Sequence, residues 1–128
     1  MKVVKILHIE DNEDIAELFQ EMIEILGHDY EFVTDGKEGV KRVTEGNFDL
    51  IFLDITMPRF SGFDVLYELL NHHHSGKIVV ITASELSTSQ TSELEELEVY
   101  ETIKKPVILN SLSNLLDSFE KKMMDIQH

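Results

Sequence analysis

Short apolar runs alternate along this chain with longer segments in which apolar residues recur every three or four positions. Short runs rich in β-branched residues indicate strands, and the longer period indicates amphipathic helices. The pattern predicts five strands, at residues 3–9, 30–33, 50–53, 78–81 and 100–104. The clearest helix follows the first strand, with one apolar face made by Ile15, Leu18, Phe19, Met22, Ile23 and Leu26.

Helices are predicted after each strand, with glycines marking two of their ends. Gly27 stops the first helix, Gly46 stops the second, and Asp35-Gly36 is interpreted as a turn before the second. A loop breaks the pattern at residues 57–62. The predicted ranges of the helices after the first are 38–45, 63–70, 84–97 and 108–119.

The segment at residues 84–97 is the weakest of these helices, because it is rich in Ser and Thr and its apolar stripe is thin. Two capping boxes compete for its start. Ser87 with Gln90 is one, and Ser92 with Glu95 is the other. We therefore predict a weakly specified helix here.

Strict alternation of strands and helices is typical of an α/β fold with a parallel sheet. With right-handed crossovers, five strands and five helices most often form a doubly wound sheet in the strand order 2-1-3-4-5. The length of 128 residues fits one domain and leaves little room for a second. We therefore expect residues 1–128 to form a single α/β domain, with no further domain in this chain.

The composition describes a strongly acidic chain, with 25 Asp and Glu against 11 Lys and Arg and a net charge of −14. This charge disfavours nucleic acid and anionic membranes as partners, because both would repel it. The absence of Cys excludes disulfides, thiolate nucleophiles and zinc sites built on Cys. No apolar run is long enough to cross a bilayer, and the first residues lack the pattern of a signal peptide. A cytoplasmic protein is the default expectation.

Polar residues follow the predicted strands at their carboxyl ends, where open parallel sheets bind ligands. In the expected strand order the first and third strands are neighbours, so acids at their ends should meet. Three carboxylates with no Cys or His among them suit Mg²⁺ or Mn²⁺. The residues at these ends are Glu10 and Asp11 after the first strand, Asp54 after the third, Thr82 after the fourth and Lys105 after the fifth.

A carboxylate nucleophile, a divalent ion, a Lys cation and a Thr hydroxyl together make a site for an aspartyl phosphate. Asp54 is the best candidate nucleophile, because it is central and because a carboxylate at the mouth of an apolar strand needs partners. An aspartate-based phosphohydrolase would need a second acid two residues later, where Thr56 stands.

Four short motifs carry a family resemblance. They lie in one order at the ends of the predicted strands, and they are Ile9-Glu10-Asp11, Leu53-Asp54-Ile55-Thr56-Met57-Pro58 with Ser61-Gly62, Ile81-Thr82-Ala83-Ser84, and Lys104-Lys105-Pro106. Through them the whole chain resembles the receiver domain of bacterial two-component response regulators. The resemblance implies a flavodoxin-like fold. It implies a phosphoacceptor that catalyses its own phosphoryl transfer and autodephosphorylation, and not a turnover enzyme.

The resemblance also implies how phosphate is taken up. Asp54 would accept a phosphoryl group from a phosphohistidine on a sensor histidine kinase or a histidine phosphotransfer protein. Asp11, Asp54 and the backbone carbonyl of Thr56 would hold Mg²⁺, with Glu10 acting directly or through water. Phosphorylation would then change the surface that binds a downstream protein.

Thr82 and Lys105 would contact phosphoryl oxygens by the same resemblance, and the Lys105-Pro106 peptide bond would be cis. The family usually has an aromatic residue three positions before the Lys, where it reports phosphorylation. Thr102 stands there, and Tyr100 would share its strand face. Thr82, Thr102 and Tyr100 are therefore the candidate switch residues. Because Thr102 stands where the family usually has an aromatic residue, an alternative stays open. The chain could be a pseudo-receiver, an interaction domain that binds its partner regardless of phosphate.

The run His72-His73-His74 invites a metal-site interpretation. Three consecutive residues cannot all face one ion on a regular element. We therefore interpret the run as a solvent-exposed loop.

Overall fold

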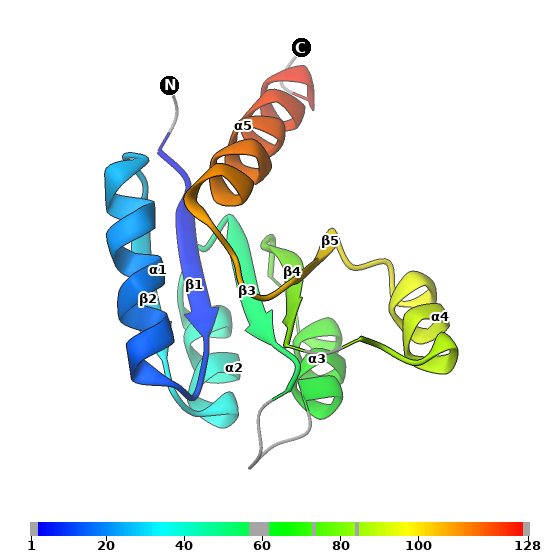
Figure 1. The fold of residues 1–128 in the computed structure, drawn as a ribbon. Helices are drawn as coiled ribbons and strands as arrows, with labels where there is room; N and C mark the ends of the chain where they lie inside the picture. The colour runs from blue at the N-terminus through cyan, green and yellow to red at the C-terminus, as the bar shows by residue number, and fades with distance from the viewer. Residues whose placement is uncertain (1–2, 57–61, 73, 84, 127–128) are drawn as a thin grey trace.

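The computed structural model describes residues 3–56, 62–72, 74–83 and 85–126. Strands and helices alternate through these ranges, as the sequence predicts (Figure 1). The strands are β1 (Lys5–Ile9), β2 (Asp29–Val33), β3 (Leu50–Asp54), β4 (Lys77–Thr82) and β5 (Glu101–Lys104). The helices are α1 (Glu13–Ile25), α2 (Gly36–Glu45), α3 (Gly62–Asn71), α4 (Thr88–Glu96) and α5 (Leu109–Ile126). Within the described ranges, none of these helices has the length and apolar character needed to cross a membrane.

The strands form one parallel sheet in the order β2-β1-β3-β4-β5, which confirms the predicted doubly wound architecture. β3 is the middle strand, and all of its residues are buried. A strand that is apolar along its length needs helices on both faces. The register places Ile9 of β1 beside Leu53 of β3, so the carboxyl ends of these two strands lie level.

Helices cover the two faces of the sheet in separate groups (Figure 1). On one face α1 and α5 pack through an apolar cluster that includes Phe19 and Leu116. On the other face α2 and α3 pack through a cluster that includes Val43 and Leu66. α4 lies beyond the edge strand β5, and its buried residue is Leu94. The carboxyl ends of the strands therefore lie at one edge of the sheet, between the two layers of helices.

Several details differ from the sequence-based predictions. The last helix runs to Ile126 and not to residue 119. The first strand begins at Lys5 and not at residue 3. Asp35 and Gly36 do not form a separate turn. Asp35 caps α2, because its side chain accepts a hydrogen bond of 2.7 Å from the N–H of Lys37. Leu18 is 53% exposed, since the buried face of α1 is narrower than predicted.

The competition between the two capping boxes ends in favour of Ser87. The Ser87 hydroxyl accepts a hydrogen bond of 3.1 Å from the N–H of Gln90, and the Gln90 side chain accepts one of 3.0 Å from the N–H of Ser87. Two orphan donors at the helix start are thus satisfied reciprocally. α4 therefore begins at Thr88, and Ser92 lies inside it.

Candidate functional site

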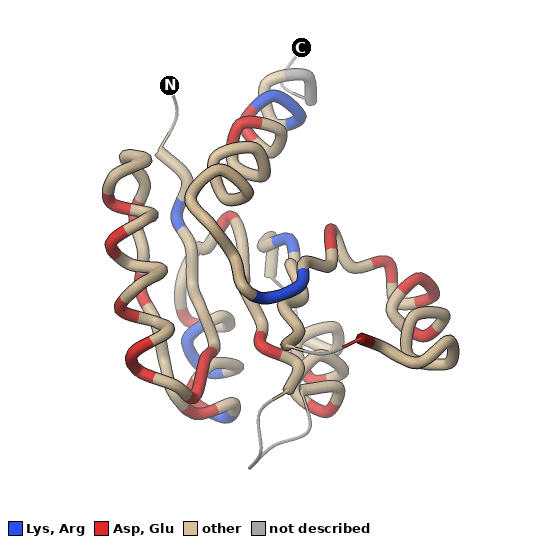
Figure 2. Tube along the Cα trace, viewed as in Figure 1, with Lys and Arg blue, Asp and Glu red and all other residues tan. Residues whose placement is uncertain are grey.

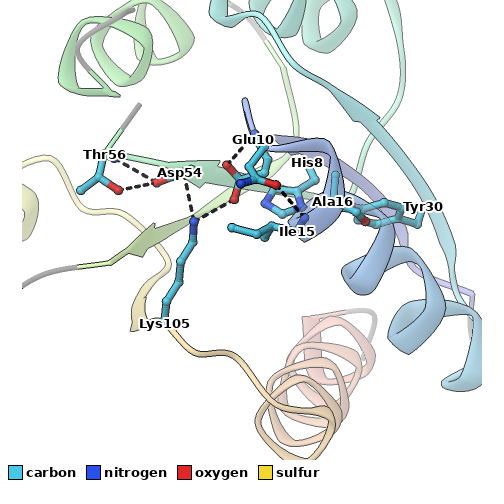
Figure 3. A network of polar contacts seen from close by, with 9 residues as sticks. His8, Glu10, Ile15, Ala16, Tyr30, Asp54, Thr56 and Lys105 are labelled. Carbon is cyan, nitrogen blue, oxygen red and sulfur yellow. Dashed lines mark hydrogen bonds and ion pairs between the residues drawn. The ribbon is translucent and has the colours of Figure 1, made fainter. Parts of the chain in front are cut away.

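The carboxyl ends of β1, β3 and β5 bring acidic and basic side chains together. Acidic residues outnumber basic ones along the chain (Figure 2), and one half-buried Lys lies among the acids at this edge of the sheet. Glu10 directly follows β1, Asp54 is the last residue of β3, and Lys105 directly follows β5. Figure 3 shows their side chains converging on one point. The sequence-based prediction that these strand ends meet is confirmed.

Lys105 bridges two buried carboxylates. Its Nζ lies 2.8 Å from Oε1 of Glu10 and 3.1 Å from Oδ2 of Asp54. Glu10 is 0% exposed and Asp54 is 2% exposed. An unpaired buried carboxylate is costly, so the ammonium group is what allows two acids to lie together here.

The turn after β3 holds the other oxygen of Asp54. Oδ1 accepts hydrogen bonds from the backbone N–H of Thr56 at 2.9 Å and from the Thr56 hydroxyl at 2.8 Å. An Asp side chain often bonds to the backbone two residues later in this way, so the contact is local in origin. With Oδ2 facing Lys105, both oxygens of Asp54 are held in place.

These contacts move the pKa values of the three groups differently. Burial raises the pKa of Glu10 to about 7, and its hydrogen bond with Asp54 adds to the effect. Burial also pushes the pKa of Asp54 upward, but the hydrogen bonds with Glu10 and Thr56 and the charge of Lys105 outweigh it and leave that pKa below its ordinary value. Burial works against the Lys105 ammonium, yet its bonds to the two acids hold its pKa above the ordinary value. Asp54 is therefore the carboxylate that stays ionised, as a nucleophile must.

Asp11 completes an acidic cluster at this edge of the sheet. One carboxylate oxygen from each of Glu10, Asp11 and Asp54 lies within 4.8 Å of the others, and Asp11 is the exposed member. Oxygen ligands of this kind suit Mg²⁺ or Mn²⁺. The cluster fits a divalent cation, because like charges this close repel one another without one.

Thr82 and Thr102 lie together, whereas Tyr100 lies elsewhere. Thr82 is buried at the end of β4 and lines, with Thr102, a groove of about 410 Å³ between β5 and α4. Tyr100 precedes β5, and its ring packs edge-on against Phe119 of α5 with 5.7 Å between centroids. The prediction that Tyr100 and Thr102 share a strand face is therefore wrong, because the alternation does not extend back before β5. Their roles as switch residues stay predictions.

A polar pair beside the site, buried His8 and half-buried Tyr30, was missed by the sequence-based reasoning. Nδ1 of His8 lies 2.6 Å from the hydroxyl of Tyr30, and that hydroxyl donates a hydrogen bond of 3.0 Å to the backbone carbonyl of Ala16. Burial lowers the pKa of His8 to about 3, although the charge of Asp54 acts in the other direction. One signal was available in the sequence. A polar residue inside an apolar strand needs a hydrogen-bonding partner.

Some of the motif residues lie outside the described residues, namely Met57, Pro58, Ser61 and Ser84. The predicted loop at residues 57–62 is therefore described only at its last residue. The fourth motif is described, and its Lys105-Pro106 peptide bond is cis, as the resemblance implies.

Two of the three consecutive histidines are described, and both cap the end of α3. Nδ1 of His72 lies 2.7 Å from the carbonyl oxygen of Glu68, and Nε2 of His74 lies 2.8 Å from that of Leu69. Imidazole donors satisfy carbonyls that have no partner within the helix. The loop interpretation is confirmed for the exposed His72, whereas His74 is half-buried. His73 lies outside the described residues.

Comparison of the sequence with models of known protein families identifies the family of this chain. The family model of the response regulator receiver domain matches residues 6–117. The transcriptional regulatory protein QseB of Haemophilus influenzae is 26% identical over 125 residues, which make up 98% of this chain and 56% of that protein. The chain spans about half the length of the curated relatives that it matches.

Solved receiver domains have the same fold. The CheY-like receiver domain from Methanospirillum hungatei gives a TM-score of 0.85 at 19% identity, with 97% of this chain and 99% of that one covered. The receiver domain of the sensor histidine kinase PA1611 from Pseudomonas aeruginosa gives 0.80 at 22% identity, with 92% and 98% covered, and holds a magnesium ion in its active site cleft. At these identities the likeness shows the fold alone.

Proposed function

The chain belongs to the response regulator receiver domains, which are phosphoacceptor signalling domains of two-component systems, and we propose that Asp54 is its phosphoacceptor. The donor would be a phosphohistidine on a sensor histidine kinase or a histidine phosphotransfer protein. An Asp54 oxygen forms a bond to phosphorus while the phosphorus–nitrogen bond of the donor breaks, and the donor imidazole leaves with a proton. The observation that carries this proposal is the buried Asp54 carboxylate, which Lys105 bridges to Glu10.

Mg²⁺ or Mn²⁺ would be held by Glu10, Asp11 and Asp54, whose oxygens already lie within 4.8 Å of one another. The backbone carbonyl of Thr56 is a further proposed ligand. When bound, the ion supplies positive charge that neutralises phosphoryl oxygens. Without such charge, an incoming phosphoryl group would meet three carboxylates at close range.

Lys105 and Thr82 would contact the phosphoryl oxygens. The Lys105 ammonium lies 3.1 Å from Oδ2 of Asp54, so it is within reach of a group bonded there. Thr82 ends β4, in which its neighbour Ile81 pairs with Asp54 across the sheet. Because Thr82 also lines the groove with Thr102, a movement of Thr82 would alter that groove and the surface offered to a downstream protein.

The protein would act as a signalling module that processes only its own phosphoryl group. Self-catalysed transfer and autodephosphorylation, one receiver domain over residues 1–128, and a cytoplasmic location all stay predictions of this assignment. The pseudo-receiver alternative is not favoured, because the Asp54–Lys105 pair is intact.

Incubation with Mg²⁺ and acetyl phosphate, followed by intact-mass spectrometry, tests the proposal. We expect one added phosphoryl group that is absent from Asp54→Asn and present in Asp117→Asn, an exposed acid on α5. Chelation of the divalent ion should suppress the adduct. An adduct that survives Asp54→Asn, or no adduct with either acetyl phosphate or a cognate kinase, would contradict the assignment.

A further inference from the structure

The groove between β5 and α4 has an apolar floor. Its volume of about 410 Å³ lies toward the small end of the roughly 300–1,000 Å³ that is usual for ligand pockets. Buried Leu94 and half-buried Leu86, Val99 and Ile103 line it. We call this site the β5–α4 groove. It offers one or two large apolar side chains a place away from water.

The sequence of α4 explains why the chain does not fill this groove itself. α4 is rich in Ser, Thr and Glu, and Leu94 is its buried residue. A helix with so narrow an apolar face cannot cover the edge of a sheet. β5 is the edge strand, and its residues are exposed except for half-buried Ile103. The apolar side chains at this edge are therefore accessible to a second molecule.

The rim of the groove is acidic. Figure 2 shows acidic residues along α4 and in the segment that leads into β5. Glu85, Glu95 and Glu101 line the groove together with one cation, Lys104, and this cation pairs with Glu85. Among the described residues, no ion pair joins Glu95 or Glu101 to a cation. Unpaired carboxylates around an apolar floor favour an occupant that brings positive charge.

Charge and shape together select the kind of occupant. Nucleic acid, an acidic protein segment or a second copy of this chain, whose net charge is −14, would bring further negative charge to the rim. A cationic segment without an apolar side chain would leave the floor exposed to water. A segment with both features would bury its apolar side chain against Leu94 and place its cations beside Glu95 and Glu101.

The inner end of the groove reaches the segments of the proposed phosphoryl site. Thr82 lines the groove, and it pairs with Lys104 across β4 and β5. The carbonyl oxygen of Thr82 accepts a hydrogen bond of 2.8 Å from the N–H of Lys105, whose ammonium group faces Asp54. A phosphoryl group on Asp54 and an occupant of the groove would therefore act on the same two segments.

We propose that the β5–α4 groove binds a protein segment in which one bulky apolar side chain is flanked by Lys or Arg. The segment belongs to the downstream protein, so this part of the inference rests on the proposed function. The preference for a basic and apolar segment rests on the groove alone, through Leu94 on its floor and Glu95 and Glu101 on its rim.

Short peptides with one central Trp test this preference. One peptide carries Lys on both sides of the Trp, and its matched counterpart carries Glu at the same positions. Because the chain contains no Trp, fluorescence of the peptide Trp reports binding directly. We expect the Lys peptide to bind the unphosphorylated protein about tenfold more tightly than the Glu peptide, since it gains two exposed ion pairs.

Removal of the rim acids separates binding at the groove from attraction to an acidic chain. Glu95→Gln combined with Glu101→Gln should weaken the Kd of the Lys peptide about tenfold. Glu38→Gln combined with Glu45→Gln removes the same net charge from exposed positions of α2, and should leave that Kd nearly unchanged. Equal weakening by the two double variants would overturn the inference.

A side chain that occupies the groove from within the chain tests the apolar floor. Thr102→Tyr places a ring in the groove and should weaken binding of the Lys peptide by about tenfold or more, as when the pocket of an anchoring side chain is lost. Thr44→Tyr, at an exposed position of α2, should have no effect. Unchanged binding to Thr102→Tyr would place the peptide elsewhere and overturn the inference.

The same samples, treated with Mg²⁺ and acetyl phosphate and weighed by mass spectrometry, keep the two proposals apart. Equal affinity for the Lys and Glu peptides in a protein that gains a phosphoryl group would overturn the inference about the groove. A clear preference for the Lys peptide in a protein that gains none would support the chemistry of the groove and contradict the proposed function.

Discussion

Glu10 and Lys105 stand 95 residues apart in the chain, yet the Nζ of Lys105 lies 2.8 Å from the Oε1 of Glu10. The pair joins the segment after the first strand to the segment after the last. Asp54, on the middle strand, uses the same ammonium group. One cation therefore influences the ionisation of both buried acids.

Replacement of the Lys105 ammonium group should change the pKa values of both acids. Lys105→Met should raise the pKa values of Asp54 and Glu10, because Lys105 lowers both. Carbon NMR titration of the carboxyl groups measures this. Phosphorylation by acetyl phosphate should slow by about a hundredfold, as when one preorganised donor is lost. Lys104→Met is the matched control, because Lys104 is exposed and pairs with exposed Glu85. Unchanged titration of Asp54 in Lys105→Met would contradict the bridge.

Stability of the metal-free protein should fall as pH rises through the window between the ordinary carboxyl value of 4.5 and about 7, the folded-state pKa of Glu10. In this window the folded protein holds a proton that the unfolded chain has released, so the free energy of unfolding decreases with pH. Urea denaturation at several pH values measures the slope.

Glu10→Gln should flatten this slope, whereas Glu13→Gln, an exposed acid at the start of α1, should leave it unchanged. Added Mg²⁺ should offset the loss of stability at the upper end of the window, because the ion binds the deprotonated carboxylate. An equal slope in wild type and Glu10→Gln would show that Glu10 does not hold the extra proton.

Gly62→Ala should destabilise the fold by roughly 2–3 kcal/mol, the cost of forcing atoms into a packed site. A Cβ at Gly62 would lie 2.3 Å from the Cα of Ile55 and 2.4 Å from its carbonyl oxygen, which are backbone atoms. Gly39→Ala should cost less, because its Cβ would meet side-chain atoms of Ile9, which have more freedom to move. Because Ile55 leads into Thr56, phosphorylation should slow in Gly62→Ala alone. Equal unfolding free energies for the two variants would contradict the expected difference in stability.

Thr102→Tyr should stabilise the protein by about 1 kcal/mol, through partial burial of an aromatic ring. Thr102 lines the groove of about 410 Å³ together with Leu86 and Leu94, and the ring would fill part of it. Thermal unfolding measures the change. Thr44→Tyr, at an exposed position of α2, should give no such gain. A lower melting temperature for Thr102→Tyr would show that the groove does not accept a ring.

Sequence patterns predicted the fold well where apolar periodicity alone decides the structure. The uniformly apolar run Leu50–Leu53 is the buried middle strand, as predicted. The pattern was insufficient where polar contacts decide. Asp35 is of a residue type that is common in turns, but its side chain caps a helix. Leu18 fits the stripe of α1, yet the sheet covers only the side of that helix on which Ala16 lies.

The residue types of the site could be predicted from the sequence, whereas the burial of its side chains and their contacts could be predicted only in part. Strand ends and the order of the sheet place Glu10, Asp54 and Lys105 together, and both follow from the alternation along the chain. The complete burial of Glu10 does not follow from the sequence, because it depends on how the segments after β1 and β5 pack. The same holds for the His8–Tyr30 pair, whose two members come from different strands.

The distance along the chain between Glu10 and Lys105 has a consequence for synthesis and for proteolysis. A nascent chain carries Asp54 long before it carries Lys105, and until β5 docks at the edge of the sheet Asp54 lacks its ammonium partner. A cut that separates the two ends would likewise leave the aspartate without its surroundings. A fragment that lacks Lys105 would therefore keep the proposed phosphoacceptor without the ammonium group that faces it.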